Sequence, residues 1–563
     1  MQNTRFTVFV WVVIFLVAGL PSLYAQKADA GFFNGRIWTG NPQQPWVSAL
    51  AIKDNKIVAV GDDKTVRPMV NKMGAFYDLK GGFVMPGFND SHIHFTGSSR
   101  RLLVVDLTGA RSLEEMRQRV AKFARENPHE PWITGGGWEY ANMPGQRLPT
   151  KADLDAIVSD RPVVLGAYDG HTSWVNSKAL EIGQVTKDTQ FTGFGEIVFD
   201  AQTKEPTGVL KEGAMGLVSR HVPAPTREQT LAALRLGLKR AASLGITSIQ
   251  NASGSPGEVE IYDELLKNGE LNLRATFAIS VSPTTTQADI DRIAALAKKY
   301  SGPRLRVGAV KIVVDGVIET YTAAMLAPYT NKPETSGTPA YTREQLNNVV
   351  AMADKAGLQV YIHAIGDKGV RMALDSFANA IKLNGKRDSR FRIEHIETVD
   401  AADIPRFKQL GVIASMEPIH ADPGTIDVWS ANIGPDRTSR GFAWRALEKA
   451  GATLIFSSDH PASISLDPIR GLHNAVNRQT IEGQPPNGWQ PQHRVSVATA
   501  LRAYTVNGAF ASFEEGIKGK LQAGMLADFI VLDANPFTVR PADLYKARAG
   551  MTYFDGKLIY RNF

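Results

Sequence analysis

The sequence predicts an α/β protein built on a (β/α)8 barrel of the TIM type. A large insertion should follow the first barrel strand, and a small β-sandwich should form from both termini. Three observations support this. Short β-rich segments alternate with long amphipathic ones in the middle of the chain, both ends carry strand patterns, and one interval is too long for a simple crossover. The 563 residues exceed one ordinary core but suit a barrel of about 250 residues with additions.

Residues 1–25 have the pattern of a secretory signal peptide. MQNTR carries one positive charge, an apolar run of 15 residues follows, and Ala25 offers a small residue at a cleavage point. A second cleavage pattern ends at Ala30, but it would cut into the first predicted strand. A membrane anchor is the alternative, although a spanning helix needs roughly 20 residues. We therefore predict a secreted or periplasmic protein without a stable membrane anchor after cleavage.

The two ends of the mature chain, residues 26–80 and 497–563, are predicted to share one split β-domain. GFFNGRIWTG and SALAIKDNKIVAVGD near the start, and LADFIVLD and MTYFDGKLIY near the end, look like strands joined by turns. Two strand-rich ends that cannot each bury a sheet face should pair into one sandwich. The chain has no cysteine, so its core and any bound metal must stabilise it outside the cell.

Residues 81–496 are predicted to form the barrel. The eight strand candidates are FVMPGF, GITSIQ, LRATFAI, RVGAVKIVV, LQVYIHAI, FRIEHI, GVIASMEP and TLIFSSD. Helical patterns such as REQTLAALRLGLKRAASLG and TREQLNNVVAMADKAG lie between most of them, several with helix-start residues before them and glycine after. Residues 96–226 are far too many for a crossover, so we expect an insertion that shapes the pocket.

The polar residues that interrupt this pattern fall near the carboxyl ends of the predicted strands, where barrel enzymes place their chemistry. They are His92, His94, Lys311, His363, His395 and Asp459. Side chains repeat with period two along a strand, so the histidines of SHIH point to one face and can share a metal ion. A single His-x-His or a lone core histidine is usually incidental. Their common position at strand ends favours a metal site.

Lys311 and Asp459 add to the predicted metal site. A lysine in an apolar strand is costly to bury as an ammonium, so it either pairs with Asp315 or stays neutral and reactive. In a site with two metals, its amine can react with carbon dioxide to give a carbamate that bridges both cations. Asp459 follows an apolar strand and could bind the first metal through one oxygen and accept a proton through the other.

These motifs resemble the amidohydrolase superfamily. PGFNDSHIH, VKIVVDG, IHAIGD, RIEHIE and SSDHP are similar to its ligand signatures, and GGGWEY, YDGHTSWVNSKAL, GITSIQN and GMLADFIVLD are similar to amidohydrolase family 3, the YtcJ-like branch. The resemblance runs from about Ala28 to the C-terminus. It implies a metal-dependent hydrolase with a split β-sandwich, in a branch that includes enzymes cleaving N-substituted formamides and related amides.

The chain departs from that branch at two places near the predicted barrel mouth. His460 stands where an aromatic residue is common, and Glu417-Pro418-Ile419-His420 stands where Gln-Pro-x-His is common. These positions affect the substrate preference more than the metal site. Alternatively, His460 and Glu417 only support the residues that hold the metals.

We predict an exported hydrolase that cleaves a carbon–nitrogen bond of a small non-peptide amide, either an N-substituted amide or formamide or a cyclic amide. Two divalent cations, expected to be zinc, would lower the pKa of a bridging water to about 7. His363, His395 and their metal would polarise the carbonyl, and Asp459 would pass the proton to the leaving nitrogen. A mononuclear deaminase, in which Lys311 does not bridge, and a non-catalytic metal-containing binding protein remain alternatives.

Candidates for substrate binding come from the predicted insertion. They are Trp138, Asp169, His171, Trp174 and Asn176. The alternative is that the tryptophans pack the insertion onto the barrel, because large aromatic side chains serve both purposes. The formal net charge is +7, but the basic residues are spread along the chain without a nucleic-acid motif. We therefore predict a small-molecule amide and no nucleic acid as partner, and the sequence leaves a homo-oligomer open.

Overall fold

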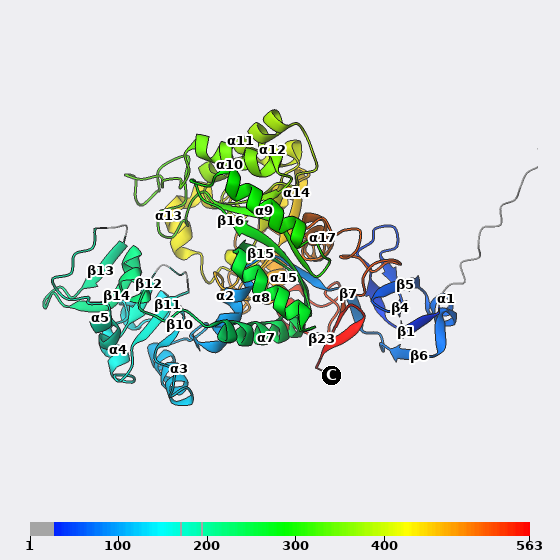
Figure 1. Cartoon of the computed structure of the whole chain (residues 1–563), viewed down its shortest axis with the longest axis horizontal. Coiled ribbons are helices and arrows are strands. Elements are labelled where there is room, and N and C mark those ends of the chain that lie inside the picture. The colour runs from blue at the N-terminus through cyan, green and yellow to red at the C-terminus, as the bar shows by residue number, and fades with distance from the viewer. Residues whose placement is uncertain (1–26, 169, 171, 193–194, 563) are drawn as a thin grey trace, which may run out of the picture.

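The computed structural model describes residues 27–168, 170, 172–192 and 195–562 (Figure 1). The predicted signal peptide lies outside this range. Figure 1 shows a central barrel with one β-sheet region projecting on one side and a second β-rich region on the other. Within the described residues, every helix is too short or too polar to cross a membrane.

The central sheet has eight parallel strands, which confirms the predicted α/β barrel architecture. In order around the sheet they are β8 (Phe88–Ile93), β15 (Ile246–Gly254), β16 (Arg274–Ser280), β17 (Leu305–Val313), β18 (Gln359–Ala364), β19 (Arg392–His395), β20 (Ile413–Met416) and β21 (Thr453–Phe456). The ring closes between β8 and the residues just after β21. The Asp459 amide donates to the His92 carbonyl at 2.8 Å, and the Ser458 amide donates to the Asp90 carboxylate at 3.0 Å.

The first predicted barrel strand divides into two strands. β7 (Phe83–Pro86) pairs with β2 (Arg36–Trp38) and β22 (Phe529–Leu532) in another sheet, so only β8 belongs to the barrel. Gly87 separates them, and a Cβ atom there would lie 2.2 Å from Oγ1 of Thr247. The prediction of FVMP as barrel was wrong because the apolar run FVMPGF continues from β7 through Gly87 to the first residue of β8, with no polar residue at the point where the chain changes sheets.

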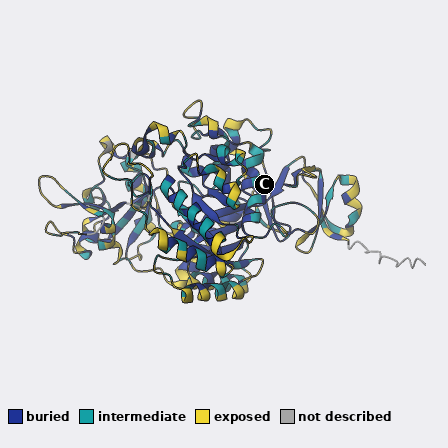
Figure 2. Cartoon of the chain, turned by 90° about the horizontal axis from the view of Figure 1, so that it is seen from above, coloured by how far each residue is buried: buried dark blue, intermediate teal, exposed yellow. Residues whose placement is uncertain are grey.

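Helices cover the outside of the barrel. The principal ones are α7 (Arg227–Ser243), α8 (Pro256–Lys267), α9 (Gln287–Lys299), α10 (Arg343–Lys355), α11 (Asp367–Asn384), α12 (Ile404–Leu410), α14 (Trp444–Lys449) and α15 (Pro468–Asn477). Capping boxes at Thr226, Thr286 and Thr342 fix the starts of three of them. Figure 2 shows their exposed residues on the outside and buried residues toward the sheet. This shell holds the strand ends in fixed positions.

The segment between β8 and β15 carries a sheet of its own. Its strands run in the order β13 (Gly195–Phe199), β14 (Pro206–Glu212), β12 (Thr172–Val175), β11 (Val163–Ala167), β10 (Ile133–Trp138) and β9 (Val105–Asp106). Helices α3 (Leu113–Glu126), α4 (Lys151–Asp155), α5 (Ser177–Ile182) and α6 (Gly216–Ser219) accompany it. Two hydrophobic clusters made only of residues from this segment hold the sheet and helices together.

Two further sheets lie at the opposite side of the barrel. One runs β5 (Lys56–Gly61), β4 (Ala49–Lys53), β1 (Ala28–Phe33), β6 (Val70–Asp78), and the other runs β24 (Lys557–Arg561), β23 (Ala549–Phe554), β22, β7, β2, β3 (Trp46–Val47). Phe32 and Leu50 of the first sheet share a buried cluster with Phe529 and Val531 of the second. Residues 497–511, which we assigned to the β-domain, form α16 (Val497–Ala503) and α17 (Val506–Ala511) and contact barrel strand β21.

Candidate metal centre

The residues predicted as metal ligands lie together at the carboxyl end of the barrel. They are His92, His94, Lys311, His363, His395 and Asp459. All except His92 line one cavity of about 280 Å³, and His92 is fully buried against it. Since β8, β17, β18, β19 and the segment after β21 each supply part of the set, the closed barrel brings together residues as far apart as 92 and 459.

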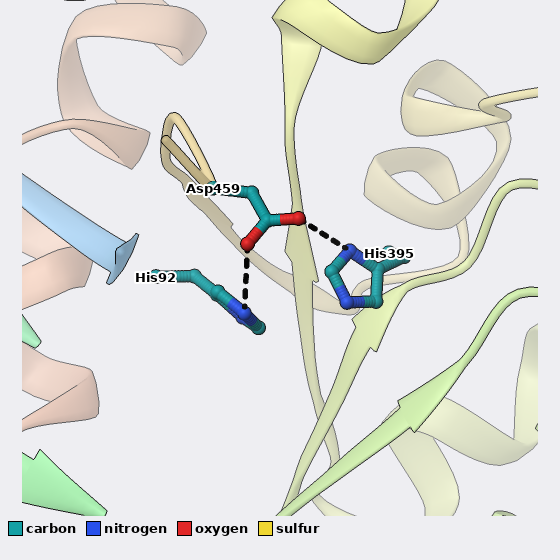
Figure 3. Close-up of side chains that lie close together, drawn as sticks. All are labelled: His92, His395 and Asp459. Carbon is teal, nitrogen blue, oxygen red and sulfur yellow. Dashed lines mark ion pairs between the residues drawn. The ribbon is translucent and has the colours of Figure 1, made fainter. Parts of the chain in front are cut away.

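Asp459 lies at the centre of this cluster. Its Oδ1 is 3.1 Å from Nε2 of His94 and 3.4 Å from Nε2 of His92. Its Oδ2 faces the other side, 4.0 Å from Nδ1 of His395 (Figure 3). Asp459 has a left-handed φ of 53°, an uncommon conformation that the surrounding structure must hold in place. The carboxylate therefore connects two groups of imidazoles with its two oxygens.

Lys311, His363 and His395 form the neighbouring part of the cluster. Nζ of Lys311 is 3.4 Å from Nε2 of His92, and the rings of His363 and His395 have centroids 4.4 Å apart. His395 also has a left-handed φ, of 75°, at the end of β19. Lys311 thus lies on the His92 side of the cluster, within the same cavity as His363 and His395.

Two buried glutamates contact the histidines from behind. Glu394 was not predicted from the sequence, whereas support of the metal-holding residues was one of the two predictions for Glu417. Oε2 of Glu394 lies 2.5 Å from Nδ1 of His92, and Oε2 of Glu417 lies 2.9 Å from Nδ1 of His395. Arg392 donates to both oxygens of Glu394 at 2.9 Å. A carboxylate on Nδ1 places the proton there and leaves Nε2 of His92 with its lone pair toward the cavity.

Burial controls the charges at the site. It lowers the pKa of Lys311 and lowers the pKa values of His92 and His363 well below the usual range, which favours a neutral amine and neutral imidazoles. Burial alone would raise the pKa of Asp459, but contact with His94 and the charge of His395 bring it below its ordinary value. His92, His363 and Lys311 therefore offer neutral nitrogen donors beside an ionised carboxylate. Burial would also lower the pKa of His395, but Glu417 and Asp459 outweigh it and raise that pKa.

These donors fit a divalent cation. Oδ1 of Asp459 is buried and, among the described residues, has no hydrogen-bond partner, although two imidazole nitrogens lie within 3.4 Å. Ligand atoms of His92, His395 and Asp459 all lie within 4.8 Å of one another. Buried polar atoms without partners are costly, and a cation shared by imidazole and carboxylate removes that cost. Zinc prefers such nitrogen and oxygen donors.

His420 also lines the cavity. The sequence marked it only as the last residue of Glu417-Pro418-Ile419-His420. Its Nδ1 lies 3.4 Å from Oε1 of Glu397, and its Nε2 lies 3.6 Å from Oδ2 of Asp459. Trp429 donates to the other oxygen of Glu397 at 2.7 Å. Burial lowers the pKa of His420, but Glu397 and Glu417 outweigh it and raise the pKa to about 9. The sequence signal available for it was a histidine four residues after the end of β20.

Three of the insertion residues predicted to bind substrate, Trp138, Trp174 and Asn176, do not line the cavity. Trp138 and Trp174 are fully buried in the insertion and donate to the carbonyls of Leu165 and Thr150. Asn176 is also buried and accepts from the Ala179 amide at the start of α5. These three therefore support the insertion, because its small sheet needs large buried side chains and helix caps.

Asp169 and His171 lie outside the described residues. Tyr168, next to them, lines the central cavity, so the insertion reaches the site at this point. His460 is not part of the cavity lining, and its Nδ1 lies 2.7 Å from Oγ of Ser98. His460 therefore connects the loop after β21 to α2 (Phe95–Arg100) and does not line the cavity that holds the predicted ligands.

Comparisons with known proteins agree with this geometry. The amidohydrolase family matches residues 75–560. YtcJ of Bacillus subtilis, a chain assigned to the amidohydrolases, is 30% identical over 538 residues and covers 93% of this chain and 98% of its own. The N-substituted formamide deformylase of Arthrobacter pascens is 25% identical over 553 residues, 95% of this chain and 99% of its own.

A comparison with solved structures also finds a metal-dependent hydrolase. The crystal structure of an uncharacterised metal-dependent hydrolase from Pyrococcus furiosus superposes with a TM-score of 0.71 and 30% identity, covering 90% of this chain and all of that one. The family match spans the barrel strands that carry every predicted ligand. The chain therefore belongs to the amidohydrolase family and is a metal-dependent hydrolase.

Proposed function

We propose that this hydrolase cleaves the carbon–nitrogen bond of a small non-peptide amide, such as an N-substituted formamide or a cyclic amide. The observation that carries the proposal is the two-sided placement of Asp459. Its Oδ1 faces His92 and His94, and its Oδ2 faces His395 and His420 across the cavity. The similarity to an N-substituted formamide deformylase supports the choice of amide.

His92, His94 and Asp459 would hold one divalent cation, and His363 and His395 would hold a second. Lys311 would connect them as a carbamate, formed when its neutral amine attacks carbon dioxide and loses a proton. The lowered pKa of Lys311 supports that reaction, because only the unprotonated amine is a nucleophile. When bound, the cations supply a hydroxide nucleophile at neutral pH and polarise the amide carbonyl.

Asp459 carries the proton in this proposal. It accepts the proton of the attacking water as the oxygen–carbon bond forms, and it returns that proton to the nitrogen as the carbon–nitrogen bond breaks. The products are a carboxylic acid and an amine. Glu394 and Glu417 keep His92 and His395 fixed during these steps, since each carboxylate contacts Nδ1 of its histidine.

The size of the cavity supports a small substrate. Its volume is about 280 Å³, near the lower end for ligand pockets. The lining mixes the predicted ligands with apolar side chains such as Val313, Ile419 and Ile464. A folded peptide chain would not enter this space, whereas an amide with a short substituent would.

A panel assay tests the proposed function. Zinc-loaded protein is incubated with N-alkylformamides, cyclic imides, simple esters and aminopurines, and released acid, amine or ammonia is measured. We expect turnover of one of the amide classes that a chelator abolishes and added zinc restores. Ammonia release from an aminopurine without amide turnover would instead support the mononuclear deaminase, and no turnover of any class would support a binding protein.

We also propose that the protein is exported, on the basis of the signal-peptide pattern in residues 1–25. Mass spectrometry of the mature protein from its native cell envelope is the test. We expect an N-terminus at Gln26. An intact chain that begins at Met1 and stays in the cytoplasm would contradict export.

A further inference from the structure

Val313 is an apolar side chain whose exposure the metal ligands do not explain. It ends β17, and 46% of it is exposed, whereas Ile312 and Val314 on either side are fully buried. Val313 lines the central cavity. Because apolar surface is unfavourable in water, an apolar side chain left open in a concave site is well placed to contact a ligand.

The strand register places Val313 in the same layer as the metal ligands. It pairs with His363 on β18, and it follows Lys311 by two residues, so both side chains point to the same face of β17. A valine has no donor or acceptor and can hold neither a cation nor a proton. At this position its available role is to contact the substrate beside the reacting group.

Other apolar side chains continue this surface around the cavity. They come from the segments that follow β17, β18, β20 and β21 and comprise Val317, Ile365, Ile419 and Ile464. We propose that Val313 and this apolar wall receive the substituent of the amide and select an uncharged, apolar one. The inference rests on the proposed amide hydrolysis and adds a specificity-determining residue to it.

Two formamides of nearly equal shape test the selection. N-Butylformamide and N-(2-methoxyethyl)formamide have chains of the same length. The butyl compound has a methylene group at the position where the methoxyethyl compound has an ether oxygen. We expect the wild-type kcat/KM to favour the butyl compound by about tenfold, as is typical for one methylene in an apolar pocket. Val313→Thr keeps the branched shape but introduces a hydroxyl, and it should bring the ratio close to one.

A matched variant separates this role from a general effect of the substitution. Val428→Thr changes the same chemical group on α13 (Asp427–Thr438), where 54% of Val428 is exposed, and Val428 does not line the cavity. It should leave the ratio at its wild-type value. A wild-type ratio near one, or a ratio that Val313→Thr leaves unchanged, would overturn the inference.

A binding measurement keeps this test separate from the test of the proposed function. If neither formamide is hydrolysed, the same two compounds are titrated calorimetrically into the zinc-loaded protein. Tighter binding of the butyl compound that is lost in Val313→Thr supports the apolar subsite even though amide hydrolysis has failed. Equal affinities, or no measurable binding of either compound, overturn it.

Discussion

At the scale of the residue, the proposed mechanism gives Asp459 a chemical role that its neighbours do not duplicate. Replacing it by asparagine keeps one oxygen toward His92 and His94 but removes the group that accepts a proton. We expect Asp459→Asn to retain much of the metal and to lose turnover by about 10²- to 10⁴-fold, the usual contribution of a general acid–base group. Metal content and kcat measured on the same preparation check this, and near-wild-type turnover would remove Asp459 from the role.

Glu394 should control the metal affinity without touching the metal. Glu394→Gln removes the charge that holds the proton on Nδ1 of His92 and leaves Arg392 without its carboxylate partner. We expect the affinity for the first cation to fall about 10- to 100-fold, measured by competition with a chelator.

Asp354→Asn is the matched control for that measurement. Asp354 is a buried carboxylate on α10 that pairs with Arg387 at 2.7 Å and lies outside the cavity. It should lower stability while leaving the metal affinity unchanged. An equal loss of metal affinity in both variants would mean that Glu394 acts only through general stability.

The sequence was informative about ligands and uninformative about what surrounds them. Parallel strands end at one face of a barrel, so His92, Lys311 and His395 could be grouped from the sequence alone. The contacts of Glu394 and Glu417 could not be predicted, because they join side chains on different strands. A glutamate next to a histidine in one strand points to the opposite face in a regular strand, and the pattern gives no partner for it.

At the scale of the element, the insertion behaves as a folded unit with its own core. Trp174 donates from Nε1 to the Thr150 carbonyl at 2.8 Å and is fully buried. We expect Trp174→Phe to cost about 1 kcal/mol of stability through that hydrogen bond and to leave KM unchanged. Urea unfolding and steady-state kinetics check this, and a several-fold rise in KM without loss of stability would restore a substrate contact.

Large aromatic side chains explain why these insertion residues were hard to assign. The same tryptophan fills a core or lines a pocket, and the residues around Trp138 and Trp174 do not distinguish the two. The prediction that β7 belongs to the barrel was wrong for a related reason. The apolar run of β7 continues through Gly87 to Phe88, the first residue of β8, and only the close approach at Gly87 shows where the chain changes sheets.

At the scale of the whole molecule, a buried charge cluster joins the barrel to the β-region formed with the C-terminus. Arg274, at the start of β16, contacts Asp528 before β22 and Asp555 between β23 and β24. Burial would raise the pKa of Asp555, but Arg274 and Arg304 outweigh it and lower the pKa. The cluster should therefore make the junction sensitive to acid.

The sign of this pH dependence follows from the lowered pKa. A carboxylate whose folded pKa is depressed contributes stability above its unfolded value of about 3.9 and loses it as the pH falls through the folded value. Asp555→Asn should cost about 2 kcal/mol at neutral pH, as for a hydrogen bond to a charged group, and should flatten the loss of stability below about pH 4. Urea unfolding at pH 7 and pH 3.5 checks this, and an equal cost at both pH values would contradict it.

We propose that Lys311 bridges two cations at the carboxyl end of the barrel. The measurement that tests it most directly is the metal content per chain of protein prepared with zinc and bicarbonate, beside a Lys311→Ala variant. We predict about two zinc ions per parent chain, because one bridging carbamate would bind two cations. We predict fewer zinc ions per chain in the variant. About one ion in both proteins would contradict the bridging carbamate and leave a mononuclear site.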